Sequence, residues 1–128
     1  MTDVQTLTEL QLVILQVLWD REEATTQDIH AELHVDRGLA LTTVATLLSR
    51  LEKRGILKHR KDGRQYVYRA LVTRPEVRRS KIRELTETLF EGDAAALISH
   101  LVRSEETDPG DLERIKALIS QAEAASDA

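Results

Sequence analysis

Apolar side chains in the first third of the chain recur at helical spacing and predict two helices. Thr8 and Gln11 have the spacing of a capping box, and aliphatic residues follow at three- and four-residue intervals. A second, shorter helix is predicted from Thr25, with Asp28 in its first turn. Residues 36–38, Asp-Arg-Gly, then mark a turn.

The next predicted helix, from about Leu41 to Arg54, separates apolar from polar side chains most clearly. Its expected inner arc is aliphatic: Leu41, Val44, Leu47, Leu48 and Leu51. Its outer arc carries hydroxyls followed by cations: Thr42, Thr43, Thr46, Ser49, Arg50, Lys53 and Arg54. A solvated helix usually interleaves Glu with Lys to form i,i+4 pairs, and this arc does not. We therefore expect the outer arc to face an anion.

A β-hairpin is predicted after this helix. Residues 57–61 and 65–69 are compatible with strands, and the Asp-Gly pair between them favours a tight turn because Gly accepts positive φ. Tyr66 and Tyr68 are expected to share one strand face and to cover the small core. The tip of the hairpin gathers cations: Arg60, Lys61 and Arg64.

Beyond the hairpin the helical period returns and predicts three more helices. The first ends near Gly92, Asp93 caps the second, and Asp108-Pro109 begins the third, which is expected to fray over residues 124–128. Units below ~40–60 residues are marginal alone. We therefore expect residues 74–128 to form a dimerisation region, rather than to fold back on the N-terminal part. The expected interface residues are Ile82, Leu85, Leu89, Leu97, Leu101, Leu112, Ile115, Leu118 and Ile119.

Charge is distributed unevenly along the 128 residues, whose net charge is −4. Residues 1–37 hold two Lys/Arg and eight Asp/Glu, a net charge of −6. Residues 38–83 hold thirteen Lys/Arg and three Asp/Glu, a net charge of +10. Residues 84–128 hold three Lys/Arg and eleven Asp/Glu, a net charge of −8. A basic segment inside an acidic chain predicts contact with a polyanion, and with nucleic acid above all.

Composition argues against several other classes of protein. The chain has no cysteine, so disulfides, iron–sulfur clusters and thiolate zinc sites are excluded. It has no apolar run near ~18 residues and no signal peptide, so we expect a cytoplasmic protein without a membrane partner. No phosphate loop or catalytic constellation is recognisable, and we expect neither catalysis nor a cofactor. His30 and His34 have an i,i+4 spacing that suits a metal, but no third ligand is evident, and we expect no metal site.

The predicted order of helix, helix, turn, helix and hairpin describes a winged helix-turn-helix domain over residues 1–73, followed by the helical dimerisation region over residues 74–128. The fold class is therefore mainly α with a small β-hairpin wing. In such a domain the third helix enters the major groove of double-stranded DNA, where threonines reach base edges and cations reach phosphates. The wing cations would position the protein on the backbone. A homodimer would place two recognition helices ~34 Å apart and read a palindrome.

Three segments carry a resemblance to a known family. Residues 43–57 (TVATLLSRLEKRGIL), residues 62–68 (DGRQYVY) and the opening from LTELQ at residues 7–11 resemble the penicillinase and methicillin-resistance repressors. The resemblance implies a homodimeric repressor that occupies a palindromic operator and blocks transcription. It also implies DNA contacts at Thr43, Thr46, Arg50, Gly63 and Arg64.

The chain departs from the family pattern at three places. Ser-Pro-Lys often precedes the matching threonine in the family, whereas this chain has Ala40-Leu41-Thr42, so its operator preference is expected to differ. The antibiotic-responsive members are cleaved at an Asn-Phe bond that corresponds to His100-Leu101, which argues against a sensor protease as a partner. Copper-responsive relatives carry a cysteine cluster, which is absent here.

The alternative from another functional class is a dimeric adaptor, or a non-specific DNA-binding protein, whose basic face docks an acidic partner. Specific duplex binding should weaken steeply with salt and should depend on sequence. Equal affinity for a scrambled duplex would favour the alternative.

Overall fold

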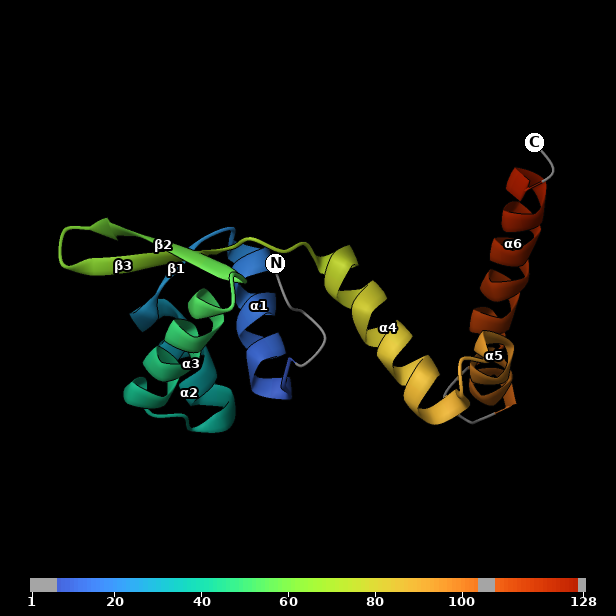
Figure 1. Cartoon of the computed structure of the whole chain (residues 1–128), viewed down its shortest axis with the longest axis horizontal. Helices are drawn as coiled ribbons and strands as arrows, with labels where there is room; N and C mark the ends of the chain where they lie inside the picture. The colour runs from blue at the N-terminus through green and yellow to red at the C-terminus, as the bar shows by residue number, and fades with distance from the viewer. Residues whose placement is uncertain (1–6, 104–107, 127–128) are drawn as a thin grey trace. The chain divides into compact units, whose positions relative to one another are not determined.

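The computed structural model describes residues 7–103 and 108–126 (Figure 1). The chain divides into two compact units, Met1–Ile82 and Arg83–Ala128, and the boundary falls inside the fourth helix. The first unit contains α1 (Glu9–Arg21), β1 (Ala24–Thr25), α2 (Thr26–Arg37), α3 (Leu41–Lys53), β2 (Leu57–Asp62), β3 (Gln65–Ala70) and the start of α4 (Arg74–Phe90). The second unit contains the rest of α4, α5 (Ala94–Arg103) and α6 (Pro109–Ser126). The predicted fold class is confirmed. No helix within the described ranges is long and apolar enough to cross a membrane.

The first two helices begin after Thr8 and Thr25, as the sequence predicts, and the structure shows a capping box at each start. Thr8 Oγ1 accepts a hydrogen bond from Gln11 N at 3.2 Å, and Thr8 N donates to Gln11 Oε1 at 3.0 Å. Thr25 and Asp28 form the same reciprocal pair at 3.0 and 3.1 Å. The hydrogen bonds from Thr25 also lower the pKa of Asp28. These caps satisfy backbone N–H groups that would otherwise lack partners, and they fix where α1 and α2 start.

The core of the first unit lies where α1, α2 and α3 meet the base of the sheet. Its fully buried aliphatic side chains are Ile14, Leu15, Leu18, Ile29, Leu33, Val44, Leu48, Leu51, Ile56 and Leu57. Each such side chain contributes about 1.5–3 kcal/mol by leaving water. The core therefore holds α3 by one face and leaves its other face on the surface.

The sheet has three antiparallel strands in the order β1-β3-β2. The predicted hairpin is confirmed, but its turn is tighter than the sequence suggested, because Asp62 pairs with Gln65 and only Gly63 and Arg64 remain between the strands. Gly63 has a φ of 65°, which a two-residue hairpin turn requires at this position. The two-residue strand β1 was not predicted, since it is too short to show an alternating pattern.

Two expected core positions are wrong. Tyr68 is buried, but Tyr66 is 41% exposed, because Tyr66 lies further toward the tip of the hairpin, which projects beyond the helices (Figure 1). Leu41 is 42% exposed, because it is the first residue of α3 and lies beside the wing. Both side chains therefore belong to the surface between α3 and the hairpin.

The start of α4 is fastened to α1 within the first unit. Trp19 Nε1 donates a hydrogen bond to the carbonyl oxygen of Val72 at 2.9 Å. Arg74 forms an ion pair with Asp20 at 2.9 Å, and its guanidinium lies 5.3 Å from the centroid of the Trp19 ring. Val77, one turn into α4, is buried. The first turns of α4 are consequently part of the core that carries α3.

The second unit is helical, and α5 and α6 begin directly after Asp93 and Asp108, the caps that the sequence predicts. Asp93 Oδ1 accepts from Ala96 N at 3.0 Å, and Asp108 Oδ1 accepts from Asp111 N at 2.8 Å. The expected fraying is wrong for residues 124–126, because α6 continues to Ser126 through alanines, which have the highest helix propensity. Residues 127–128, the rest of that prediction, lie outside the described residues. Neither α5 nor α6 buries a side chain within this single chain.

Candidate nucleic-acid interface

The outer face of α3 presents the residues that the sequence placed there. Val44, Leu48 and Leu51 anchor the inner face in the core. The exposed outer side chains are Thr42, Thr43, Thr46, Ser49, Arg50 and Lys53. The arrangement gives a helix whose first turns carry hydroxyls and whose last turns carry cations, with the side chains free to meet a ligand.

Thr46 already uses its hydroxyl proton within the helix. Its Oγ1 donates to the carbonyl oxygen of Thr42 at 2.9 Å. The hydroxyl oxygen keeps lone pairs that can accept a hydrogen bond, and the methyl group is the remaining apolar part of the side chain. Against a base pair such a side chain accepts from the amino group of adenine or cytosine, or contacts a thymine methyl.

The cations at the end of α3 do not all face the same way. Arg50 and Lys53 are exposed, whereas Arg54 is half-buried and its Nη1 lies 3.4 Å from Gln11 Oε1 on α1. The Arg54 guanidinium is therefore directed toward α1 and away from the open face of α3. Arg50 and Lys53 are the cations of α3 that the structure places on the open face.

The wing cations are divided between the two faces of the hairpin. Lys61 is paired across the strands with Tyr66, and its Nζ lies 5.7 Å from the centroid of that ring. Arg60 is opposite Val67 on the other face, where it forms an ion pair with Glu23 at 2.8 Å. Arg64 and Gly63 form the turn itself. Lys61 and Arg64 thus border α3, and Arg60 does not.

A contact that the sequence did not predict joins α3 to the wing. Glu52 Oε2 accepts a hydrogen bond from His59 N at 3.0 Å and lies 2.5 Å from His59 Nδ1. The His59 ring stacks on Tyr66, with 4.2 Å between centroids and 16° between planes. Burial raises the pKa of Tyr68, and the Glu52 carboxylate raises it further. We call the contacts of Glu52, His59 and Tyr66 the brace, because they fix the hairpin against α3.

A groove of ≈ 610 Å³ lies between the starts of α2 and α3 and the wing. Its lining residues are Thr26, Gln27, Leu41, Ala45, Lys61, Gly63, Arg64, Gln65 and Tyr66. None of these described lining residues is acidic. The position of the hairpin turn in the sequence is enough to predict that Lys61 pairs with Tyr66 across the strands. The packing of the wing against α3 cannot be predicted in this way, because the periodicity of a sequence carries no information about contacts between distant elements.

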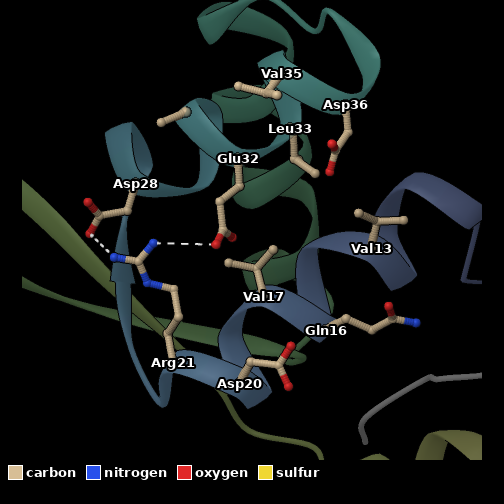
Figure 2. A pocket seen from close by; sticks show the side chains of 11 residues that line it. Val13, Gln16, Val17, Asp20, Arg21, Asp28, Glu32, Leu33, Val35 and Asp36 are labelled. Carbon is tan, nitrogen blue, oxygen red and sulfur yellow. Dashed lines mark ion pairs between the residues drawn. The ribbon is translucent and has the colours of Figure 1, made fainter.

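A second groove, of ≈ 600 Å³, lies between α1 and α2 and has the opposite character (Figure 2). Its apolar floor is bordered by carboxylates: Asp20, Asp28, Glu32 and Asp36. Arg21 lies 3.7 Å from both Asp28 and Glu32 and neutralises only part of that charge. This face repels a polyanion, whereas the groove between α3 and the wing has no acidic residue in its described lining.

His30 and His34 lie side by side on α2. The rings of His30 and His34 are 5.3 Å apart, and no group of three or more His, Cys, Asp or Glu in the described ranges could hold a metal ion.

Comparisons with known proteins agree with this geometry. The family model described as the penicillinase repressor matches residues 7–121. The methicillin resistance regulatory protein MecI of Staphylococcus aureus strain N315 is 19% identical over 108 residues, which cover 84% of this chain and 88% of the relative. The transcriptional regulator BlaI of Mycobacterium tuberculosis is 30% identical over 113 residues, which cover 87% of this chain and 82% of the relative.

Two solved structures resemble the fold. The DNA-binding domain of the repressor BlaI matches with a TM-score of 0.53 and 28% identity, over 58% of this chain and 90% of that domain. RosR of H. salinarum matches with a TM-score of 0.52 and 21% identity over 96% of this chain and 99% of its own, which shows a similar fold alone.

Proposed function

The chain belongs to the penicillinase repressor family of DNA-binding transcriptional repressors, and from this premise we propose that it acts as a homodimer on a palindromic operator. The observation that supports sequence-specific binding is the exposed face of α3, where hydroxyls precede cations beside a cationic wing. We assign base reading to Thr42, Thr43 and Thr46, and phosphate contacts to Arg50, Lys53, Lys61 and Arg64. Gly63 allows the turn to approach the backbone. Arg54 and Arg60, which are engaged by Gln11 and Glu23, have secondary roles in phosphate contact.

The homodimer is supported by apolar side chains that the single chain leaves exposed. Ile82, Leu85, Leu89, Ile98, Leu101, Leu118 and Ile119 are between 40% and 69% exposed. Exposure of so many large aliphatic side chains is unusual for a monomer and is relieved when a second copy covers them. Together with Leu97, Leu112 and Ile115, which are half-buried, they form the proposed interface, with Ile98 added to the residues expected from the sequence.

Gel-shift titration of the duplex upstream of the protein's own gene tests the proposal. Four exposed cations on each of two subunits neutralise up to about eight phosphates, so the log–log slope of affinity against salt should approach roughly −7. A scrambled duplex should bind much more weakly at the same salt concentration. Equal affinity for both duplexes would instead favour the adaptor or the non-specific binder.

The two faces of the wing supply the matched variants for this titration. Arg64→Ala should weaken binding to every duplex about equally and make the salt slope shallower by roughly 2 per dimer, since each phosphate contributes about 0.9. Arg60→Ala should change the slope less, because Glu23 already pairs with Arg60 on the far face of the hairpin. A larger loss for Arg60→Ala would show that the wing meets the backbone through its other face.

A further inference from the structure

The groove between α3 and the wing has an apolar patch that is open to solvent. Leu41 and Tyr66 are 42% and 41% exposed, and Ala45, one turn along α3 from Leu41, is exposed too. All three side chains line the same groove of ≈ 610 Å³. Because three apolar side chains gather in one groove, an apolar group of a ligand that fits there would gain hydrophobic stabilisation by covering them.

The wing side of this groove is cationic. Lys61 and Arg64 line it, and neither forms an ion pair with any residue in the described ranges. Thr26, Gln27 and Gln65 complete the lining with neutral polar groups. The groove therefore suits a ligand that carries negative charge next to a small apolar group.

A DNA strand at the edge of the major groove has this combination. Its phosphates are anionic, and the 5-methyl group of thymine is the apolar group that base pairs display in the major groove. The first residues of a recognition helix are the ones that lead into that groove. On the basis of the function proposed above, we infer that Leu41, Ala45 and Tyr66 form a subsite for a thymine methyl, while Lys61 and Arg64 hold a neighbouring phosphate.

The charge of the lining residues decides which of the two grooves suits DNA. The groove between α1 and α2 includes Val35, which is 84% exposed and more accessible than Leu41, but it is lined by four carboxylates (Figure 2). An exposed aliphatic side chain alone therefore does not make a DNA subsite. The groove beside the wing combines its apolar patch with two cations that form no ion pair with the described residues, and DNA is the partner that matches both.

Thymine-to-deoxyuridine replacement tests the subsite, because it removes the methyl group and keeps base pairing. The full-length protein first selects its preferred duplexes from a random pool, and each recurring thymine is then replaced singly. At one thymine of each half-site the replacement should weaken wild-type binding about fourfold, the equivalent of one buried methyl group. The same replacement should leave the affinity of Leu41→Ala unchanged.

Val35→Ala is the matched control, since it truncates an exposed aliphatic side chain outside the groove, and it should keep the wild-type response to deoxyuridine. Thermal unfolding checks that both variants retain the fold. If no thymine shows a replacement penalty, or if Leu41→Ala keeps the full penalty, the subsite is wrong while sequence-specific repression stands. A selection that yields no preferred duplex would overturn both the subsite and the proposed function.

Discussion

A hydrogen bond within α3 decides whether the Thr46 hydroxyl can still act as a donor or only as an acceptor. Because its proton is donated to the carbonyl oxygen of Thr42, the side chain can offer the proposed DNA partner only an acceptor oxygen and a methyl group. A threonine without that internal bond could donate or accept. The local backbone contact therefore narrows which base Thr46 can read.

Thr46→Val should relax the preference for one base pair in each half-site by about 1–3 kcal/mol, because valine keeps the shape and loses the acceptor oxygen. Titrations of the preferred duplex and of its single-base variants measure the preference. Thr88→Val is the matched control, since Thr88 Oγ1 makes the same bond to the Glu84 carbonyl oxygen at 2.8 Å on α4. Unchanged discrimination by Thr46→Val would show that Thr46 does not read a base.

At the scale of elements, the brace makes α3 and the wing one structural piece. Glu52 reaches the hairpin from the last turns of α3, and His59 connects that carboxylate to the Tyr66 ring. A hairpin tip that moved independently would pay an ordering cost on binding, which a fixed wing avoids. The brace thus links the stability of the fold to the order of the proposed binding surface.

Glu52→Ala should lower the free energy of unfolding by about 1–3 kcal/mol, because His59 N and the His59 ring lose a charged acceptor in a half-buried setting. It should also weaken binding to all duplexes alike, since the wing is less well placed. Glu23→Ala removes the exposed ion pair with Arg60 and should cost less than about 1 kcal/mol. Urea unfolding and duplex titration measure the two effects, and equal stability losses would contradict the role of the brace.

The sequence predicts elements well where their signals are local. The caps at Thr8, Thr25 and Asp108 bond to residues three positions along the chain, so the signals that predict these helix starts lie within a single turn. The prediction that Leu41 is buried was wrong because periodicity shows which face of a helix a side chain lies on. It does not show whether another element covers that face at that position. The brace also escaped prediction, since Glu52 and His59 meet only after α3 packs on the hairpin.

At the scale of the whole molecule, the proposed dimer depends on aliphatic side chains of the second unit. Leu118 and Ile119 on α6 are 60% and 49% exposed, and α5 and α6 bury none of their side chains within one chain. The assignment of residues 74–128 to dimerisation stays a prediction. The compact first unit extends to Ile82, so a separated DNA-binding fragment should include the start of α4.

Leu118→Glu should convert the protein to a monomer at micromolar concentration, because a carboxylate cannot be buried unpaired in an apolar interface. Its affinity for a palindromic duplex should fall toward that of a single half-site. Val35→Glu places the same charge at an exposed aliphatic position of the first unit and should leave the dimer intact. Analytical ultracentrifugation gives the assembly state, and a wild-type monomer would refute the dimer outright.

Trp19, the single tryptophan of the chain, lies where α1 meets the entry to α4. Its indole is hydrogen-bonded to Val72 and covered by the guanidinium of Arg74. Fluorescence from this one ring therefore reports on a defined joint without any added label. Detachment of α4 from α1 would expose the indole to water and shift its emission to the red, so the integrity of that joint can be followed in real time while operator DNA is added.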